Sequence, residues 1–163
     1  MHALRIVLIE DNRETAKMIE DFLHTNFKMA ETIVYSSGEE AIEKTKITPE
    51  LFIIDYYLDS VDPKALDGIQ IMMRLKDEHD APVIFLSSQE NATISANTIK
   101  YGAEDYVAKN SQDSFNRLEI AINNVLHNIQ LQKDIVKQRR FIGIMAFIFL
   151  TLIAGVILTK VLN

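Results

Sequence analysis

Short apolar runs and helix-spaced apolar positions alternate along most of the chain. Leu4–Ile9 is rich in branched apolar residues and ends at the polar residues 10–12, which is typical of a strand buried on both faces of a parallel sheet. From Thr15 onward apolar residues recur at helical spacing, and Ile33–Tyr35 forms a second short apolar run. The pattern therefore begins as strand, helix, strand.

The same alternation continues through the following residues. Further strands are predicted over Leu51–Ile54, Val83–Leu86 and Tyr106-Val107, and further helices over Glu39–Lys46, Gly68–Glu78, Ala92–Tyr101 and from Phe115 onward. Five strands that alternate with five helices predict an α/β fold with a parallel sheet, because right-handed crossovers place each connecting helix over the sheet.

An uncharged stretch, Phe141–Thr159, follows the last predicted helix of the main domain. Its nineteen residues would form a helix of about 28 Å, close to the hydrocarbon thickness of a bilayer. Because the stretch is apolar around its whole circumference, a membrane-spanning helix is favoured over the alternative of a buried core helix.

Charges around this stretch predict an orientation in the membrane. Four basic residues precede it, namely Lys133, Lys137, Arg139 and Arg140, whereas Lys160 alone follows it. The positive-inside rule then predicts a single-pass protein of the cytoplasmic membrane with its main domain in the cytoplasm. The chain is thus divided into a main domain over 1–128, a helical linker over 129–140 and a transmembrane helix over 141–160.

Apolar residues at heptad spacing run along the helix that begins at Phe115. They are Phe115, Leu118, Ile122, Val125, Ile129 and Val136, with Gln132 in one gap. The first of them should be buried on the sheet, which leaves Ile129, Gln132, Val136 and Arg139 as a poor zipper. A weak homodimer is the most that this pattern predicts.

Composition excludes several classes of function. The net charge is −6 without a basic block, so no nucleic-acid partner is expected. The chain has no cysteine, which excludes disulfides, thiolate nucleophiles and cysteine-type zinc sites.

Polar side chains follow four of the predicted strands. Glu10 and Asp11 end the first strand, Asp55 the third, Ser87-Ser88 the fourth, and Lys109 follows the fifth. In doubly wound sheets these ends meet at one ligand-binding edge. Three carboxylates there would raise one another's pKa, which indicates a hard divalent cation such as Mg²⁺. A carboxylate beside that ion can attack a phosphoryl group while metal and lysine neutralise its oxygens.

The segments IVLIEDN, LFIIDYYL, VIFLSS and DYVAKN resemble the response regulator receiver family of two-component signalling, over roughly residues 4–128. The resemblance implies a flavodoxin-like, doubly wound five-stranded sheet in the order 2-1-3-4-5. From the length of the uncharged stretch, the last helix is expected to extend into the transmembrane helix. The resemblance further implies that Asp55 is the phosphoacceptor, and that Asp11, Asp55, Glu10 and the backbone carbonyl of Tyr57 hold Mg²⁺.

The resemblance also implies a switch and partners. Ser87 would bind a phosphoryl oxygen, Lys109 would pair with the phosphoryl group, and Tyr106 would turn inward when Ser87 moves. A histidine kinase or phosphotransfer protein would supply the phosphoryl group, and an output protein would read the switched surface. The chain would be no enzyme beyond its own Mg²⁺-dependent phosphorylation and dephosphorylation.

One loop departs from the pattern of the family. The loop before Asp67-Gly68 is lengthened by about five residues and contains Asp59 and Asp62.

Two other functions compete with phosphorylation. A scaffold that docks a partner without phosphorylation is one alternative. A magnesium-dependent phosphohydrolase is disfavoured, because Tyr57 stands where its second acid is needed. Each site residue alone could be a helix cap or a solvated loop charge, and only the joint pattern favours phosphorylation.

Overall fold

The computed structural model describes residues 4–58, 66–88, 91–109 and 113–162, with side chains of the last helix described as far as Thr151. Contacts divide the chain into two compact units, Met1–Asn123 and Asn124–Asn163. The strands are β1 Leu4–Ile9, β2 Ala30–Tyr35, β3 Leu51–Asp55, β4 Val83–Ser87 and β5 Asp105–Ala108. The helices are α1 Arg13–Asn26, α2 Gly38–Lys44, α3 Gly68–Glu78, α4 Ala92–Lys100 and α5 Ser114–Leu162.

The first unit is built on one parallel sheet in the order β2-β1-β3-β4-β5, which confirms the predicted topology. The pairing register of β1, β3 and β4 aligns their carboxyl ends, because Ile9 lies opposite Ile54 and Asp55 lies opposite Leu86. The polar residues at these ends therefore meet at one edge of the sheet, as the sequence predicted.

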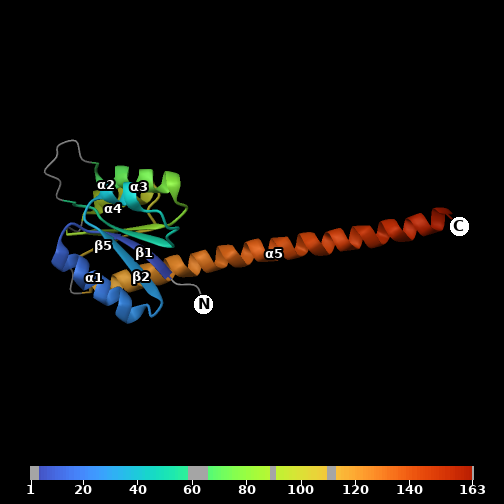
Figure 1. The fold of residues 1–163 in the computed structure, drawn as a ribbon, viewed down its shortest axis with the longest axis horizontal. Coiled ribbons are helices and arrows are strands. Elements are labelled where there is room, and N and C mark those ends of the chain that lie inside the picture. The colour runs from blue at the N-terminus through green and yellow to red at the C-terminus, as the bar shows by residue number, and fades with distance from the viewer. Residues whose placement is uncertain (1–3, 59–65, 89–90, 110–112, 163) are drawn as a thin grey trace. The chain divides into compact units, whose positions relative to one another are not determined.

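Successive side chains of each strand point to opposite faces of the sheet. Val7, Phe52 and Phe85 belong to a core cluster that also includes Ile71 and Leu75 of α3. Figure 1 shows α2, α3 and α4 over this face and α1 with the first turns of α5 over the other. Every residue of β3 and β4 is buried, and β1 is buried from Ile6 to Ile9. Their continuous apolar sequences follow from that burial.

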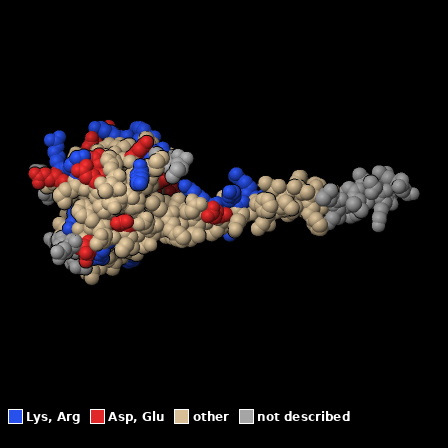
Figure 2. All heavy atoms as spheres, turned by 90° about the horizontal axis from the view of Figure 1, so that it is seen from below, with Lys and Arg blue, Asp and Glu red and all other residues tan. Residues whose placement is uncertain are grey.

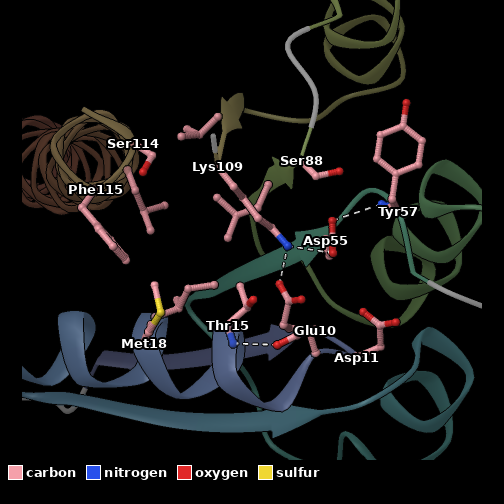
Figure 3. Close-up of a pocket in the computed structure, with 15 residues that line it drawn as sticks. Glu10, Asp11, Thr15, Met18, Asp55, Tyr57, Ser88, Lys109, Ser114 and Phe115 are labelled. Atoms are coloured by element: carbon pink, nitrogen blue, oxygen red, sulfur yellow. Dashed lines mark hydrogen bonds and ion pairs between the residues drawn. The ribbon is translucent and has the colours of Figure 1, made fainter. Parts of the chain in front are cut away.

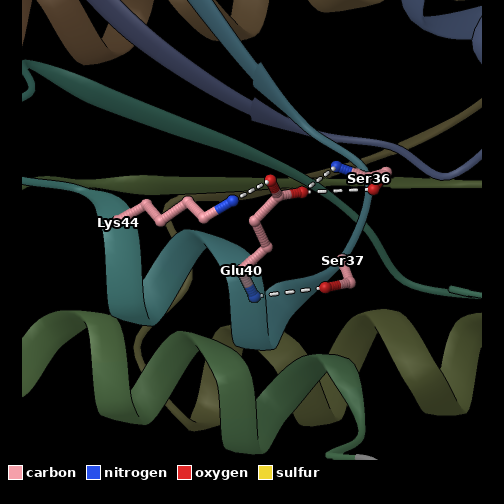
Figure 4. Close-up of polar contacts among 4 residues, drawn as sticks. All are labelled: Ser36, Ser37, Glu40 and Lys44. Atoms are coloured by element: carbon pink, nitrogen blue, oxygen red, sulfur yellow. Dashed lines mark hydrogen bonds and ion pairs between the residues drawn. The ribbon is translucent and has the colours of Figure 1, made fainter.

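Side-chain caps set where the helices begin. In α2 the Ser37 hydroxyl accepts a hydrogen bond from the Glu40 backbone N–H at 3.1 Å, and the Glu40 carboxylate accepts from Ser36 and from the Lys44 ammonium group (Figure 4). In α3 Asp67 and Gln70 form a reciprocal capping box. Asp67-Gly68 thus marks the start of a helix, which explains why this pair ends the lengthened loop. Asp59 and Asp62 lie outside the described residues.

The predicted elements all occur, and most differ from the observed ones by one or two residues. The helix Gly68–Glu78 has the predicted bounds, whereas β2 begins at Ala30, three residues before the predicted strand. Glu31 and Thr32 are polar because β2 is an edge strand, and Glu31 is exposed. An apolar run therefore marks only the end of this strand.

No helix in the described part of the chain is both long enough and apolar enough to cross a membrane. The predicted transmembrane helix over residues 141–160 therefore has no support from the structure. The side chains of its residues 152–160 lie outside the described part.

The close approach of α2 to α3 requires a glycine at position 38. A Cβ on Gly38 would lie 2.2 Å from Cδ1 and 2.4 Å from Cγ1 of Ile71, so we expect Gly38→Ala to destabilise the first unit by about 1–3 kcal/mol through overpacking. Gly143→Ala is the matched control, because a Cβ there meets nothing within 4 Å. Urea unfolding followed by circular dichroism measures both, and equal midpoints for Gly38→Ala and the wild type would contradict the expectation.

Candidate functional site at the carboxyl edge of the sheet

Three carboxylates lie together at the carboxyl edge of the sheet (Figure 3). Glu10 and Asp11 follow β1, and Asp55 is the last residue of β3. One oxygen of each lies within 4.8 Å of the others. Glu10 and Asp55 are buried, with 3% and 5% of their surfaces exposed. Buried carboxylates at this separation repel one another unless a cation lies among them.

Lys109 supplies such a cation from the turn after β5. Its ammonium group lies 2.7 Å from Oδ2 of Asp55 and also forms an ion pair and hydrogen bond with Oε2 of Glu10. Its backbone N–H donates to the Ser87 carbonyl at 2.6 Å, which fixes the turn against β4. Lys109 therefore joins the ends of three strands and neutralises part of the acidic charge.

Burial raises the pKa of Glu10 above its ordinary value of 4.5, and the nearby charge of Asp55 adds to the increase. The hydrogen bond and the positive charge of Lys109 act in the opposite direction without cancelling it. The Glu10 carboxylate therefore loses its charge at a higher pH than an ordinary glutamate does.

Backbone groups hold the neighbouring parts of the site. Oδ1 of Asp55 accepts a hydrogen bond from the Tyr57 backbone N–H at 3.1 Å. The side chain of Asn12 caps α1 by accepting from the Thr15 backbone N–H at 2.9 Å, so the turn that carries Glu10 and Asp11 is fixed by the helix that follows it. Both carboxylate segments are thereby positioned before any ligand binds.

A cavity of about 460 Å³ opens beside the carboxylates. One wall carries Glu10, Asp11, Asp55 and Lys109, and the other carries apolar side chains of α1 and of the first turns of α5, namely Met18, Ile19, Phe115 and Leu118. The Phe22 and Phe115 rings, 4.8 Å apart at their centroids, join the two helices behind it. The site is therefore half polar and half apolar.

The two serines after β4 lie differently. Ser88 lines the cavity, whereas Ser87 is fully buried at the last residue of the strand. Alternation along β4 explains this difference, because Leu86 and Ser88 share the side of the sheet that holds the cavity. Ser87 shares the side of Phe85, whose register partner on β5 is Tyr106. Tyr106 is itself buried, with 6% of its surface exposed.

The structure brings together Glu10, Asp11, Asp55 and Lys109, as the sequence predicted, and places Tyr57 beside them with its side chain exposed. Sequence reasoning missed the parts of the site that helices supply. Thr15, Met18 and Phe115 line the cavity from α1 and α5. Ser88 lines the cavity from the end of β4, where the sequence placed it. The helical wall could not be predicted in this way, because it depends on how α1 packs against α5.

The donor set suits a magnesium ion. Three carboxylates with oxygens this close, two of them buried, match the oxygen ligands that Mg²⁺ prefers. Glu10, Asp11 and Asp55 would hold the ion, and it would supply positive charge to a bound anion.

We expect Mg²⁺ binding to weaken as the pH falls toward the raised pKa of Glu10. The raised pKa of Glu10 means that its carboxylate takes up a proton at a higher pH than an ordinary glutamate does, and the ion must then displace that proton. Titration calorimetry at several pH values measures the trend. Glu10→Gln should bind more weakly with a flatter pH dependence, whereas Glu14→Gln, an exposed change in α1, should behave like the wild type. An unchanged slope in Glu10→Gln would contradict the assignment.

Comparisons with known proteins agree with this geometry. The profile of the response regulator receiver domain matches residues 6–123. A protein-glutamate methylesterase/protein-glutamine glutaminase of Oceanobacillus iheyensis is 32% identical over 68% of this chain and 31% of its own length. The transcriptional regulatory protein YdfI of Bacillus subtilis is 22% identical over 82% of this chain and 61% of its own length. A receiver domain protein structure from Clostridium thermocellum has a TM-score of 0.66 and 24% identity, over 80% of this chain and 99% of that one.

The prediction that the chain is no enzyme beyond its own phosphorylation is contradicted by the names of its relatives. Three relatives carry the enzyme name protein-glutamate methylesterase/protein-glutamine glutaminase. The chain spans about a third of their length, namely 31%, 37% and 30%. Their named activity is a property of those longer proteins.

The receiver profile covers more than half of the chain, and the carboxylates and lysine of the described site lie where the receiver motifs of the sequence place them. The chain belongs to the response regulator receiver domain family.

Proposed function

We propose that Asp55 accepts a phosphoryl group from a histidine kinase or phosphotransfer protein. The observation that carries this proposal is the position of Lys109, whose ammonium group contacts Asp55 within a cluster of three carboxylates. A buried carboxylate beside a lysine and a cation site can act as a nucleophile toward phosphorus, because both positive charges offset the repulsion between anions.

In the proposed step an oxygen of Asp55 forms a bond to phosphorus while the bond from phosphorus to the donor atom breaks. The donor leaves with that electron pair. Lys109 can follow the incoming phosphoryl group by transferring its ammonium contact from Asp55 Oδ2 to a phosphoryl oxygen. The Tyr57 backbone N–H, bonded to Oδ1, keeps the carboxylate in one orientation during the attack. Bound Mg²⁺ would neutralise further phosphoryl oxygens.

A movement of the Ser87 and Tyr106 side chains would signal to an output protein that Asp55 is phosphorylated. Ser87 is proposed to bind a phosphoryl oxygen, and Tyr106 to respond to its movement. The support is that both residues are buried and that Phe85, the register partner of Tyr106, is two residues before Ser87 on β4. Ser87→Ala should therefore retain phosphoryl uptake and lose the accompanying change around Tyr106.

We also propose that residues 141–160 attach the chain to the cytoplasmic membrane with the receiver in the cytoplasm. The support is the run of large apolar side chains from Phe141 to Leu150, most of which are at least half exposed, together with the basic residues before it. Fractionation of cells that express the full chain or residues 1–140 tests the proposal. Equal amounts of both in the soluble fraction would contradict it.

Incubation of the full chain with Mg²⁺ and acetyl phosphate tests the phosphorylation proposal. We expect a mass increase of one phosphoryl group that is lost when a chelator removes Mg²⁺ beforehand. Beryllofluoride should protect the same protein from unfolding, because it mimics the bound phosphoryl group. Absence of both effects would favour the alternative function, a scaffold that docks its partner without phosphorylation.

A further inference from the structure

One side of α5 between residues 128 and 149 is apolar and exposed. Its large apolar side chains are Leu131, Ile135, Ile142, Met145 and Phe149, which have 48%, 50%, 66%, 50% and 64% of their surfaces exposed. With Gln138 they follow one another in alternating steps of four and three residues. This spacing places all of them on one side of the helix. These six residues are called the α5 stripe.

The side of α5 away from this stripe is basic. Lys133, Lys137 and Arg140 follow the same spacing, two positions later than the stripe, which is about 200° around the helix. Figure 2 shows charged side chains gathered along this part of α5 and an uncharged stretch after them. The helix therefore presents an apolar side and a charged side before its uncharged part.

We propose that the α5 stripe binds the same stripe of a second copy of this chain in a parallel two-stranded coiled coil. In heptad notation Ile135 and Ile142 are at position a and Leu131 is at position d, a combination that favours two parallel strands. Asn128, exposed in α5, falls at position a. A polar residue at one a position fixes the register of a two-stranded coil, because it pairs best with its own copy.

Charges beside the stripe complement one another in the parallel arrangement. Asp134 is at position g and Arg139 at position e, five residues later, which is the spacing that joins position g of one strand to position e of the other. The Gln130 amide donates to both Asp134 carboxylate oxygens, at 3.1 and 3.2 Å, and so holds Asp134 on this flank. Each dimer would contain two such pairs, whereas antiparallel strands would bring like charges together.

This stripe differs from the seam predicted from the sequence. That seam contained Gln132, Val136 and Arg139, which lie on another flank of α5. In the coil proposed here Arg139 is a flanking charge, and the contacts come from branched and long apolar side chains. The proposal does not rest on phosphorylation, and the first part of the stripe, with Leu131, Ile135 and Gln138, precedes the proposed membrane segment.

Cysteine cross-linking tests the proposal directly, because the chain contains no cysteine. Leu131→Cys and Ile142→Cys probe the stripe, and Lys133→Cys and Lys137→Cys are the controls on the other side. The full chain, purified in detergent micelles without phosphodonor, is oxidised and run on a denaturing gel without reductant. We expect disulfide-linked dimers for both stripe variants and monomers for both controls, since only residues that face each other can reach disulfide geometry.

Several results would overturn the parallel coil. Cross-linking at the same rate in all four variants would mean random collision in the micelle. No cross-linking at all would mean that detergent or lipid alone covers the stripe. Cross-linking at only one of the two stripe positions would indicate crossed or antiparallel helices.

Charge reversal tests the register independently. Asp134→Arg and Arg139→Asp should each weaken self-association by about fivefold, because two attractive pairs become repulsive. The double variant should recover the wild-type association, measured by analytical ultracentrifugation. A double variant that associates no better than either single variant would contradict the proposed pairing of Asp134 with Arg139.

Discussion

Asp55→Asn is expected to abolish phosphoryl uptake from acetyl phosphate. An amide oxygen is a poor nucleophile toward phosphorus and cannot replace the carboxylate as a metal ligand of full charge. Glu10 and Asp11 remain in this variant, but the Tyr57 backbone N–H orients Oδ1 of Asp55 for the attack. Intact-mass spectrometry after incubation with Mg²⁺ should show no phosphoryl adduct.

Asp21→Asn is a matched control for this experiment. Asp21 is an exposed aspartate of α1 that pairs with Lys17 at 2.9 Å, so its loss should leave phosphoryl uptake unchanged. Equal labelling of wild type, Asp55→Asn and Asp21→Asn would show that the phosphoryl group is attached elsewhere, and the proposed role of Asp55 would be wrong.

Lys109→Met is expected to have the second largest effect. The methionine keeps the length of the side chain and removes the positive charge, which leaves Glu10 and Asp55 buried without their shared partner. Breaking a buried ion pair costs about 3–5 kcal/mol. Because 19% of the Lys109 side chain is exposed, we expect a loss near the lower end of that range, about 3 kcal/mol, in the presence of a chelator.

Mg²⁺ should restore more stability to Lys109→Met than it adds to the wild type, because the ion then neutralises carboxylates that have no other cation. Phosphoryl uptake should nevertheless stay about a hundredfold slower, since the lysine no longer stabilises the transferring group. Urea unfolding with and without Mg²⁺ measures the stability. The rate of the mass increase measures phosphoryl uptake. Lys100→Met, at the end of α4, is the control. A variant with the stability and uptake rate of the wild type would exclude Lys109 from the site.

The strand order was expected from the resemblance to the receiver family, whereas the polar cluster could be predicted because it depends on residues near strand ends. Glu10, Asp55 and Lys109 each follow an apolar run, and a parallel sheet brings such ends to one edge. The start of β2 could not be predicted, because an edge strand is free to carry polar residues such as Glu31. The apolar wall of the cavity also escaped prediction. Met18 and Phe115 are 97 positions apart, and only the packing of α1 beside α5 brings them together.

The buried position of Tyr106 has a consequence for basal signalling. In the proposed mechanism its ring turns inward on phosphorylation, yet 6% of its surface is exposed while Asp55 still pairs with Lys109. If the ring is already inside before phosphorylation, the inward state is well populated in the unphosphorylated protein. Phosphorylation can then change the ratio of inward to outward states only a little, because a ligand shifts an equilibrium only by its preference between the two states. An output protein that recognises the inward ring would then bind part of the unphosphorylated population. The contrast between resting and stimulated cells would depend on Ser87 and on the abundance of that output protein.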